Sequence, residues 1–206
     1  MKALIIVDMQ NDFMPGGALG VPVADQLVPI INALIPHFPL VVATQDWHPA
    51  DHMSFALNHP GKKVGDIIKF NQIEQILWPV HCVRNTHGAE LISTLDKGNI
   101  VNIFYKGTDK NIDSYSAFFD NARHKSTGLS DYLKSRGVND VYFAGVATDY
   151  CVLYSSLDAI DLGFSAYVIA DACRPINLNP HDEERAFAAM AAKGVKTVIS
   201  CALPLK

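Results

Sequence analysis

The sequence predicts an α/β protein with a doubly wound, six-stranded, mainly parallel sheet and helices on both faces. Six short apolar runs recur along the 206 residues, each without in-out alternation, which is typical of parallel strands covered on both faces. Segments with helical spacing separate these runs, so strand and helix alternate. The chain is 49% hydrophobic and 18% charged, which suits one sizeable core.

The strands are expected where the apolar runs lie. These runs cover residues 3–7, 40–44, 100–104, 141–145, 166–170 and 195–199. If the sheet follows the common order 3-2-1-4-5-6, the first and fourth strands are neighbours where the strand order reverses. Ligands of such sheets bind there, outside the carboxyl ends of the strands.

Helices are expected between the strands. They cover residues 24–35, 89–95, 129–136, 150–162 and 182–192. Glycine lies just past the end of three of them, at Gly137, Gly163 and Gly194, and glycine often ends a helix because it adopts the left-handed conformation.

We expect one domain over residues 1–206, because the chain is too short for two equal cores. Two irregular stretches interrupt the alternation, at about residues 46–83 and 107–127. The first is rich in His, Pro and Gly, and the second in polar and aromatic residues. Irregular segments of this length inside a compact domain usually carry function.

Charge and apolar patterning limit the partners. The formal net charge is −4 and no block of five or six like charges occurs, so no nucleic acid partner is expected. The first apolar run ends at Asp8, too early for a signal-peptide core or a membrane span. We therefore expect a cytoplasmic protein without a membrane partner. Its widely spaced cysteines are expected to be reduced: Cys82, Cys151, Cys173 and Cys201.

Cys151 follows the fourth strand and a short turn, Gly145 to Tyr150, and opens a helical segment. A thiol at a helix start lies beside free backbone N–H groups, which lower its pKa and can bind a developing oxyanion. This position predicts a nucleophile. The alternative is a small apolar residue packed at a helix start, since free cysteines are often buried.

Charged residues follow the other strands at the same edge of the sheet. Asp8 follows the first strand, Asp46 the second and Lys106 the third. In the expected strand order Asp8 faces Cys151, where a carboxylate can accept the thiol proton and a lysine can stabilise negative charge. Asp8, Lys106 and Cys151 are therefore a candidate catalytic triad. In the alternative, Asp8 is a turn residue and Lys106 a solvated cation.

A candidate metal site begins at Asp46 and His48. Residues two apart in an extended segment point to one side, so this carboxylate and imidazole would lie together. The third ligand stays open among His52, His59 and His81. Imidazole with carboxylate suits zinc, manganese or ferrous iron. In the alternative, these side chains form turns and surface hydrogen bonds.

These motifs together resemble the nicotinamidases of the isochorismatase-like cysteine hydrolase superfamily. The resemblance covers nearly the whole chain, and the D-W-H and W-P-x-H-C motifs point to the nicotinamidase branch. It is carried by residues 7–13 (VDMQNDF), 45–49 (QDWHP), 78–82 (WPVHC), 106–107 (KG), 113–119 (DSYSAFF) and 145–152 (GVATDYCV).

The resemblance implies a catalytic triad of Asp8, Lys106 and Cys151. It also implies a cis peptide bond between Val146 and Ala147, in the turn before the cysteine. The N–H groups of Ala147 and Cys151 would form the oxyanion hole.

The resemblance also implies one divalent metal ion, with zinc favoured and iron or manganese as alternatives. Its ligands would be Asp46, His48 and His81, which selects His81 from the three candidates. His52 is a direct ligand in some relatives and lies behind the ligands in others. Ser54 could approach the metal through a bound water.

A substrate pocket is implied beside the triad. Phe13 and Trp78 would sandwich a flat pyridine ring, and Val146 and Tyr115 would complete the wall. In the alternative, the aromatic residues belong to the core.

The implied reaction is metal-dependent hydrolysis of nicotinamide to nicotinate and ammonia through a thioester, a step of NAD salvage. Two other functions stay open: hydrolysis of another small amide or a vinyl ether, and a non-catalytic module that binds a metal or ligand. The sequence also leaves open whether the protein is a homo-oligomer, whether pyrazinamide is cleaved, and which group activates the deacylating water.

Overall fold

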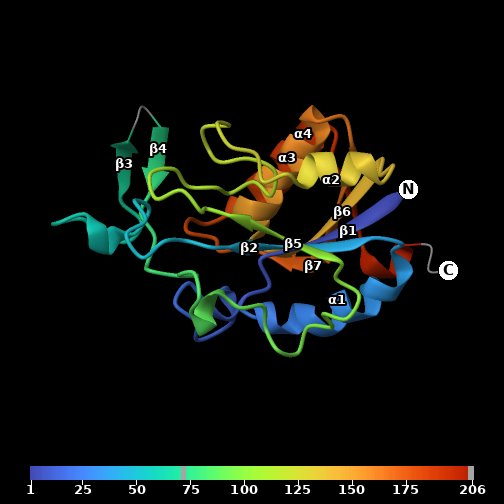
Figure 1. Cartoon of the computed structure of the whole chain (residues 1–206), viewed down its shortest axis with the longest axis horizontal. Helices are drawn as coiled ribbons and strands as arrows, with labels where there is room; N and C mark the ends of the chain where they lie inside the picture. The colour runs from blue at the N-terminus through green and yellow to red at the C-terminus, as the bar shows by residue number, and fades with distance from the viewer. Residues whose placement is uncertain (71–72, 204–206) are drawn as a thin grey trace.

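A parallel sheet of six strands forms the centre of the molecule (Figure 1). Its strands are β1 (Lys2–Val7), β2 (Val41–Asp46), β5 (Asn102–Lys106), β6 (Asp140–Val146), β7 (Ser165–Arg174) and β8 (Lys196–Val198). The computed structural model describes residues 1–70 and 73–203. The order is β5-β2-β1-β6-β7-β8, with every neighbouring pair parallel. The predicted fold class is confirmed, and β1 and β6 are neighbours where the order reverses.

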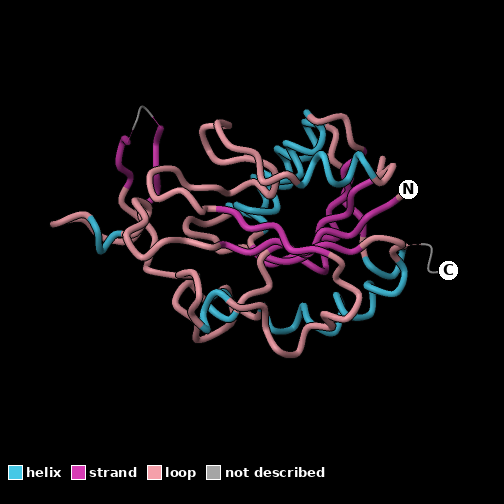
Figure 2. The backbone as a smooth tube through the Cα atoms, in the orientation of Figure 1, coloured by secondary structure: helices cyan, strands magenta, loops and turns pink. Residues whose placement is uncertain are grey.

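Helices cover both faces of the sheet, as predicted (Figures 1 and 2). One face carries α1 (Leu27–Leu34), which lies between short 3-10 turns at Ala24–Gln26 and Ile35–His37. The helix expected over residues 24–35 is therefore a shorter α-helix with a tighter turn at each end. The other face carries α2 (Leu129–Ser135), α3 (Leu153–Asp161) and α4 (Asp182–Lys193).

Side chains of β1 alternate between two apolar clusters, one on each face of the sheet. Leu4 and Ile6 pack in the cluster that contains Ile31 of α1, and Ile5 packs in the cluster that contains Leu133 of α2. Both faces of the strand are covered, which is why its sequence is apolar throughout. Each fully buried side chain of this size contributes about 1.5–3 kcal/mol to the free energy of unfolding.

The segment expected as a helix over residues 89–95 is not helical, so this prediction was wrong. A 3-10 turn at His87–Ala89 is followed by irregular backbone. Leu95 N–H donates to Ile92 O at 3.3 Å within the segment, but other backbone groups pair with the chain after β1: Ile92 N–H donates to Met9 O and Glu90 O accepts from Asn11 N–H, both at 3.0 Å. The apolar spacing fits a helix, but this long-range pairing fixes the conformation.

An antiparallel hairpin stands apart from the main sheet, at the end of the molecule away from the amino terminus (Figure 1). It consists of β3 (Ile67–Phe70) and β4 (Ile73–Ile76). The sequence did not predict it, because its strands are short and mostly partly buried or exposed. Further 3-10 turns lie at Asn11–Phe13, Ala56–Asn58 and Ser200–Ala202.

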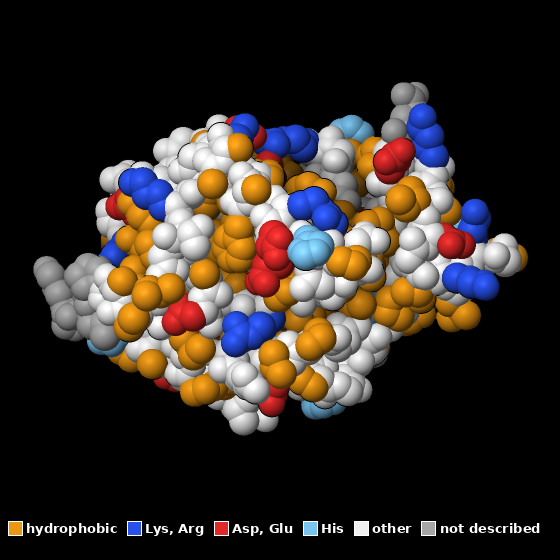
Figure 3. All heavy atoms as spheres, turned by 180° about the vertical axis from the view of Figure 1, so that it is seen from behind, with side chains coloured by type: hydrophobic (Ala, Val, Ile, Leu, Met, Phe, Trp, Pro, Cys, Tyr) orange, Lys and Arg blue, Asp and Glu red, His pale blue; other side chains and the backbone are white. Residues whose placement is uncertain are grey.

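The molecular face in Figure 3 is chemically mixed. Lys and Arg side chains stand apart on it, with acidic and apolar side chains between them. In the described part of the chain, no helix combines the length and apolar character needed to cross a bilayer.

Candidate active site

Four polar side chains that the sequence analysis expects to be functional meet at the carboxyl edge of the sheet. Asp8 follows β1, Asp46 ends β2, Lys106 ends β5 and Cys151 follows β6, and all four are buried. Lys106 Nζ lies 2.8 Å from Asp8 Oδ2 and 3.3 Å from Cys151 Sγ. It also contacts Asp46 Oδ1. The structure thus brings together the three residues expected as a triad and joins them to an expected metal ligand.

Gly145 lets β6 approach the end of β1. Its φ is +122°, and a Cβ atom there would lie 2.1 Å from Val7 O. Only glycine fits this position, because any side chain would collide with the neighbouring strand. The peptide bond between Val146 and Ala147 is cis.

Cys151 lies in a π-helical turn, Thr148–Val152, that precedes α3. Val152 N–H donates to Ala147 O at 3.0 Å, across five residues. The α-helix begins only at Leu153. The expectation that Cys151 opens the helix is corrected accordingly, and single π turns of this kind often occur at functional sites.

The pKa of the Cys151 thiol is raised well above its ordinary value by burial, and the Lys106 ammonium only partly opposes this. The carboxylates of Asp8 and Asp46 raise it further. The expectation that a helix start lowers this pKa was therefore wrong, because burial and two nearby carboxylates outweigh it. The resting group is a thiol, so nucleophilic attack requires a base.

Asp8 is placed to act as that base. Burial raises the pKa of its carboxyl group above the ordinary value, while Lys106 acts in the opposite direction. Burial alone would lower the pKa of Lys106, but the carboxylates of Asp46 and Asp8 hold it well above its usual value. Lys106 is therefore an ammonium ion between two carboxylates.

Asp46, His48 and His81 present donor atoms to one point, all within 4.8 Å of one another. His48 Nδ1 lies 2.9 Å from Gly107 O, and His81 Nδ1 lies 2.8 Å from Pro79 O. Because a carbonyl oxygen only accepts hydrogen bonds, both Nδ1 atoms carry the hydrogen. Both Nε2 lone pairs then face Asp46 Oδ2, at 3.6 and 3.7 Å. This donor set fits a divalent metal ion.

His52 and Ser54 lie next to these three residues. The His52 ring centroid is 4.3 Å from that of His48, and its Nδ1 is 2.7 Å from Ser54 Oγ. Burial lowers the pKa of His52 to about 4, so it is neutral at neutral pH. With His48 and Asp113, it forms a second group of donor atoms within 4.8 Å. His59 instead pairs with a backbone carbonyl in its own loop.

A small cavity lies against Cys151 and has mostly aromatic and aliphatic walls. Three of the four residues expected in its wall line it: Phe13, Trp78 and Tyr115. Val146, the fourth, does not, because its side chain lies on the other face of β6 and packs in the core with Ala144. The remaining lining residues are Leu19, Asp46, His81, Asp113, Ala147, Tyr150 and Ile176.

The hairpin holds one wall of this cavity in place. Tyr115 Oη accepts hydrogen bonds from Trp78 Nε1 and from Gln75 Nε2, both at 3.2 Å. Gln75 also donates to Asp113 Oδ2 at 3.0 Å. The insertion at residues 46–83 therefore supplies both a wall residue and the side chain that orients another.

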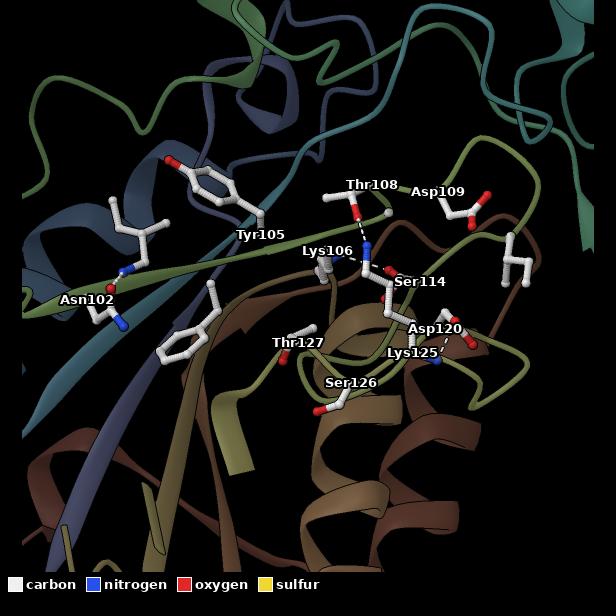
Figure 4. A pocket seen from close by; sticks show the side chains of 14 residues that line it. Asn102, Tyr105, Lys106, Thr108, Asp109, Ser114, Asp120, Lys125, Ser126 and Thr127 are labelled. Atoms are coloured by element: carbon white, nitrogen blue, oxygen red, sulfur yellow. Dashed lines mark hydrogen bonds between the residues drawn. The ribbon is translucent and has the colours of Figure 1, made fainter. Parts of the chain in front are cut away.

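A larger groove of about 410 Å³ runs along β5 and the loop that follows it (Figure 4). Lys106 and Ser114 are among its lining residues, and Lys106 Nζ donates to Ser114 O at 3.2 Å. Neither Cys151 nor the three candidate metal ligands line it. The smaller cavity is therefore the one that can present a substrate to the thiol.

Gln10 is a site residue that the sequence analysis missed. Its Nε2 donates to Asp46 O and to Ala89 O, both at 2.8 Å, and its Oε1 accepts from Asp46 N–H at 2.8 Å. This fully buried amide therefore fixes the backbone of a candidate metal ligand. The signal that could have revealed it is an uncharged polar residue just after an apolar strand.

An ammonium ion in contact with a thiol and a carboxylate, all three buried at the point where strand order reverses, is the arrangement expected of an α/β cysteine hydrolase. The chain belongs to the isochorismatase family, whose isochorismatase domain model matches residues 2–202. The site residues that the sequence analysis took from the resemblance come from segments throughout this match.

Relatives resemble the chain over nearly its full length. A nicotinamidase from Acinetobacter baylyi is 50% identical over 198 residues, which cover 96% of this chain and 92% of that protein. The solved structure of an Acinetobacter baumannii nicotinamidase and pyrazinamidase has a TM-score of 0.96 at 46% identity, covering 98% and 97% of the two chains. A Pyrococcus horikoshii pyrazinamidase, solved in complex with zinc, has a TM-score of 0.78 at 41% identity, covering 96% and 98%.

Proposed function

We propose that the protein is a nicotinamidase, a metal-dependent cysteine amidohydrolase that converts nicotinamide and water to nicotinate and ammonia. The observation that carries this proposal is one cavity bounded by Cys151, by Asp46 and His81 of the candidate metal site, and by aromatic walls. The identity to nicotinamidases over nearly the whole chain supports it. NAD salvage would be its role, and the free thiols of the four cysteines fit a cytoplasmic location.

Acylation begins with proton transfer from the Cys151 thiol to Asp8. The sulfur attacks the carboxamide carbon, and the carbonyl oxygen gains the negative charge. In our proposal the N–H groups of Ala147 and Cys151 bind this oxyanion. Lys106 stays charged throughout and stabilises whichever neighbour is negative, since its Nζ contacts both Asp8 and Cys151.

Collapse of the tetrahedral species breaks the bond from carbon to nitrogen. Asp8 returns its proton to the leaving nitrogen, ammonia departs, and a thioester to Cys151 remains. A water molecule then attacks the thioester while Asp8 accepts one of its protons. The thiolate leaves and takes that proton from Asp8, which restores the thiol and releases nicotinic acid. The acid then ionises to nicotinate, and the released ammonia takes its proton.

Asp46, His48 and His81 would hold the metal ion, because their donor atoms converge and both imidazole Nε2 atoms carry lone pairs. A bound divalent ion would supply a Lewis acid that ligates the pyridine nitrogen and so orients the ring. Zinc is favoured, because a related pyrazinamidase was solved in complex with zinc. Iron and manganese are the alternatives, since the same donor types accept them.

The walls of the cavity suit a flat heteroaromatic amide. Phe13 and Trp78 line it together with Tyr115 and Tyr150. Aromatic walls bury a planar ring and stack against it, which fixes its plane relative to Cys151. Pyrazinamide has a ring of the same size. We therefore propose it as a second substrate, and the similarity to relatives that are named pyrazinamidases supports this.

Two measurements on one preparation test the function. We expect purified protein to contain one equivalent of a divalent metal by elemental analysis and to release ammonia from nicotinamide. Removing the metal with a chelator should abolish ammonia release, and adding zinc back should restore it. Metal-loaded protein that releases no ammonia from nicotinamide would refute the proposal. Release from another small amide instead would identify a different hydrolase of the same family.

Gln10→Ala should weaken zinc binding about 10–100-fold, because residues that orient a metal ligand commonly have effects of this size. The amide clamps the backbone of Asp46, and its loss frees that ligand to move. Competition with a chromophoric chelator measures the dissociation constant directly. Gln26→Ala, an exposed glutamine outside the site, is the control. Equal zinc affinity in the two variants would show that the clamp is not needed.

A further inference from the structure

Thr44 is a buried hydroxyl in a strand that otherwise packs apolar side chains at this point. It follows Val41, Val42 and Ala43 in β2 and is fully buried. A valine has nearly the same shape, so packing alone does not call for a hydroxyl group here. Burying an unpaired hydroxyl group costs free energy, so its hydrogen bonds must account for its presence.

Both hydrogen bonds of the Thr44 hydroxyl group are made with Asp8. Thr44 Oγ1 donates to Asp8 Oδ1 at 2.7 Å, and Asp8 N–H donates to Thr44 Oγ1 at 3.3 Å. Asp8 leaves the extended path of β1 with a φ of +51°. One hydroxyl group therefore holds both the backbone and the carboxylate of Asp8 at the bend.

This pairing gives the two carboxylate oxygens of Asp8 different partners. Oδ1 is occupied by Thr44, while Oδ2 lies 2.8 Å from Lys106 Nζ. Without the hydroxyl group, the carboxylate could rotate and present either oxygen, or neither, to its partners. The donor atoms of Asp8 and Cys151 lie within 4.8 Å of each other, so proton transfer between them depends on one rotamer of a residue in a strained backbone conformation.

We propose that Thr44 is a positioning residue that orients Asp8, so that Oδ2 accepts the proton of Cys151. This inference rests on the proposed function, because it assigns Asp8 its role in the hydrolysis. Thr44 does not line the cavity and so acts on the reaction only through Asp8. Its loss should slow the chemical step and leave substrate binding unchanged.

Thr44→Val removes the hydroxyl group and keeps the shape. We expect kcat for ammonia release from nicotinamide to fall about 10–100-fold, the usual effect of losing a group that orients a catalytic residue. KM should not change. Thr44→Ser keeps the hydroxyl group and should retain most of the activity. Thr197→Val, the same substitution at an exposed position of β8, is the control.

A second pair of variants covers the case in which Thr44→Val does not fold. Thr44→Ser and Thr44→Ala both lack the Cγ2 methyl group of threonine, and only serine has the hydroxyl group. We expect kcat for ammonia release to be higher in Thr44→Ser than in Thr44→Ala, by about the same 10–100-fold. The proposal is overturned if kcat of Thr44→Val equals that of the wild type, or if kcat of Thr44→Ser is no higher than that of Thr44→Ala.

The rate of Cys151 alkylation by iodoacetamide separates this proposal from the proposed function. Alkylation followed by mass spectrometry needs no nicotinamide hydrolysis, and Asp8 must still accept the thiol proton. We expect slower alkylation in Thr44→Val than in the wild type, and recovery in Thr44→Ser. A wild type without ammonia release refutes the nicotinamidase function alone. Equal alkylation rates in all three proteins refute the role of Thr44.

Discussion

Cys151→Ala should lose ammonia release from nicotinamide almost completely, with kcat reduced on the order of 10⁶-fold, as for the removal of other catalytic nucleophiles. The reason is that Cys151 is the only cysteine among the described residues that line the cavity, so no second thiol can form the thioester. The aromatic walls remain, so nicotinamide should still bind. Ammonia release and calorimetric binding on the same sample measure the two properties separately.

Cys173→Ala is the matched control for this experiment. It makes the same substitution at another buried free cysteine, in β7, which does not line the cavity. We expect it to keep nearly full activity. If Cys151→Ala were as active as this control, Cys151 would be a packed side chain and the protein would not be a cysteine hydrolase.

Asp8→Asn should lower kcat by about 10²–10⁴-fold, the range expected for loss of a general base. An amide has the shape of the carboxylate and can still accept from Thr44, but it cannot take the thiol proton. The thiol of Cys151 then keeps its proton, because burial has already raised its pKa. KM should change little, since Asp8 does not line the cavity. Steady-state kinetics and the alkylation rate of Cys151 check both expectations.

The exposed Asp131 of α2 provides the control for this substitution. Asp131→Asn should behave as the wild type in ammonia release and in alkylation. A loss of ammonia release in Asp8→Asn with an unchanged alkylation rate would contradict the role of Asp8 as the base. Asp8 would then serve only as a counterion of Lys106.

The sheet could be predicted because its signal is local. Each central strand is a run of apolar residues, and the six runs fix the class and, with the common order, the neighbours. The wrong prediction of a helix over residues 89–95 has the same cause. Its apolar spacing is local, whereas the pairing of Ile92 with Met9 that sets its conformation joins residues far apart in sequence.

The metal ligands were only partly predictable from spacing. Asp46 and His48 lie two residues apart, but the spacing left His52, His59 and His81 equal as the third ligand. The path of the insertion brings His81 to the pair, since His48 N–H donates to Cys82 O at 3.0 Å, and it places His52 against His48 as well. Spacing along the chain carries no information about this contact. The prediction of His81 as the third ligand came from the family resemblance.

The pKa of Cys151 could not be predicted from its place after a strand. The sequence showed a turn and a helix start, which favour a lowered pKa. The structure adds burial and the carboxylates of Asp8 and Asp46, which raise it. Whether a side chain is desolvated depends on the packed fold, so this part of the site required coordinates.

Lys106 is the only lysine or arginine that is buried within residues 1–70 and 73–203. It neutralises one charge of a pair of buried carboxylates, Asp8 and Asp46. Removing one partner from a buried ion pair typically costs about 3–5 kcal/mol, a large part of the stability of an ordinary domain. In the proposed mechanism, the reaction and the stability of the fold therefore depend on the same ammonium group. An inactive substitution at Lys106 cannot by itself be assigned to lost chemistry, and evolution could exchange this residue only by rebuilding the acidic side chains around it.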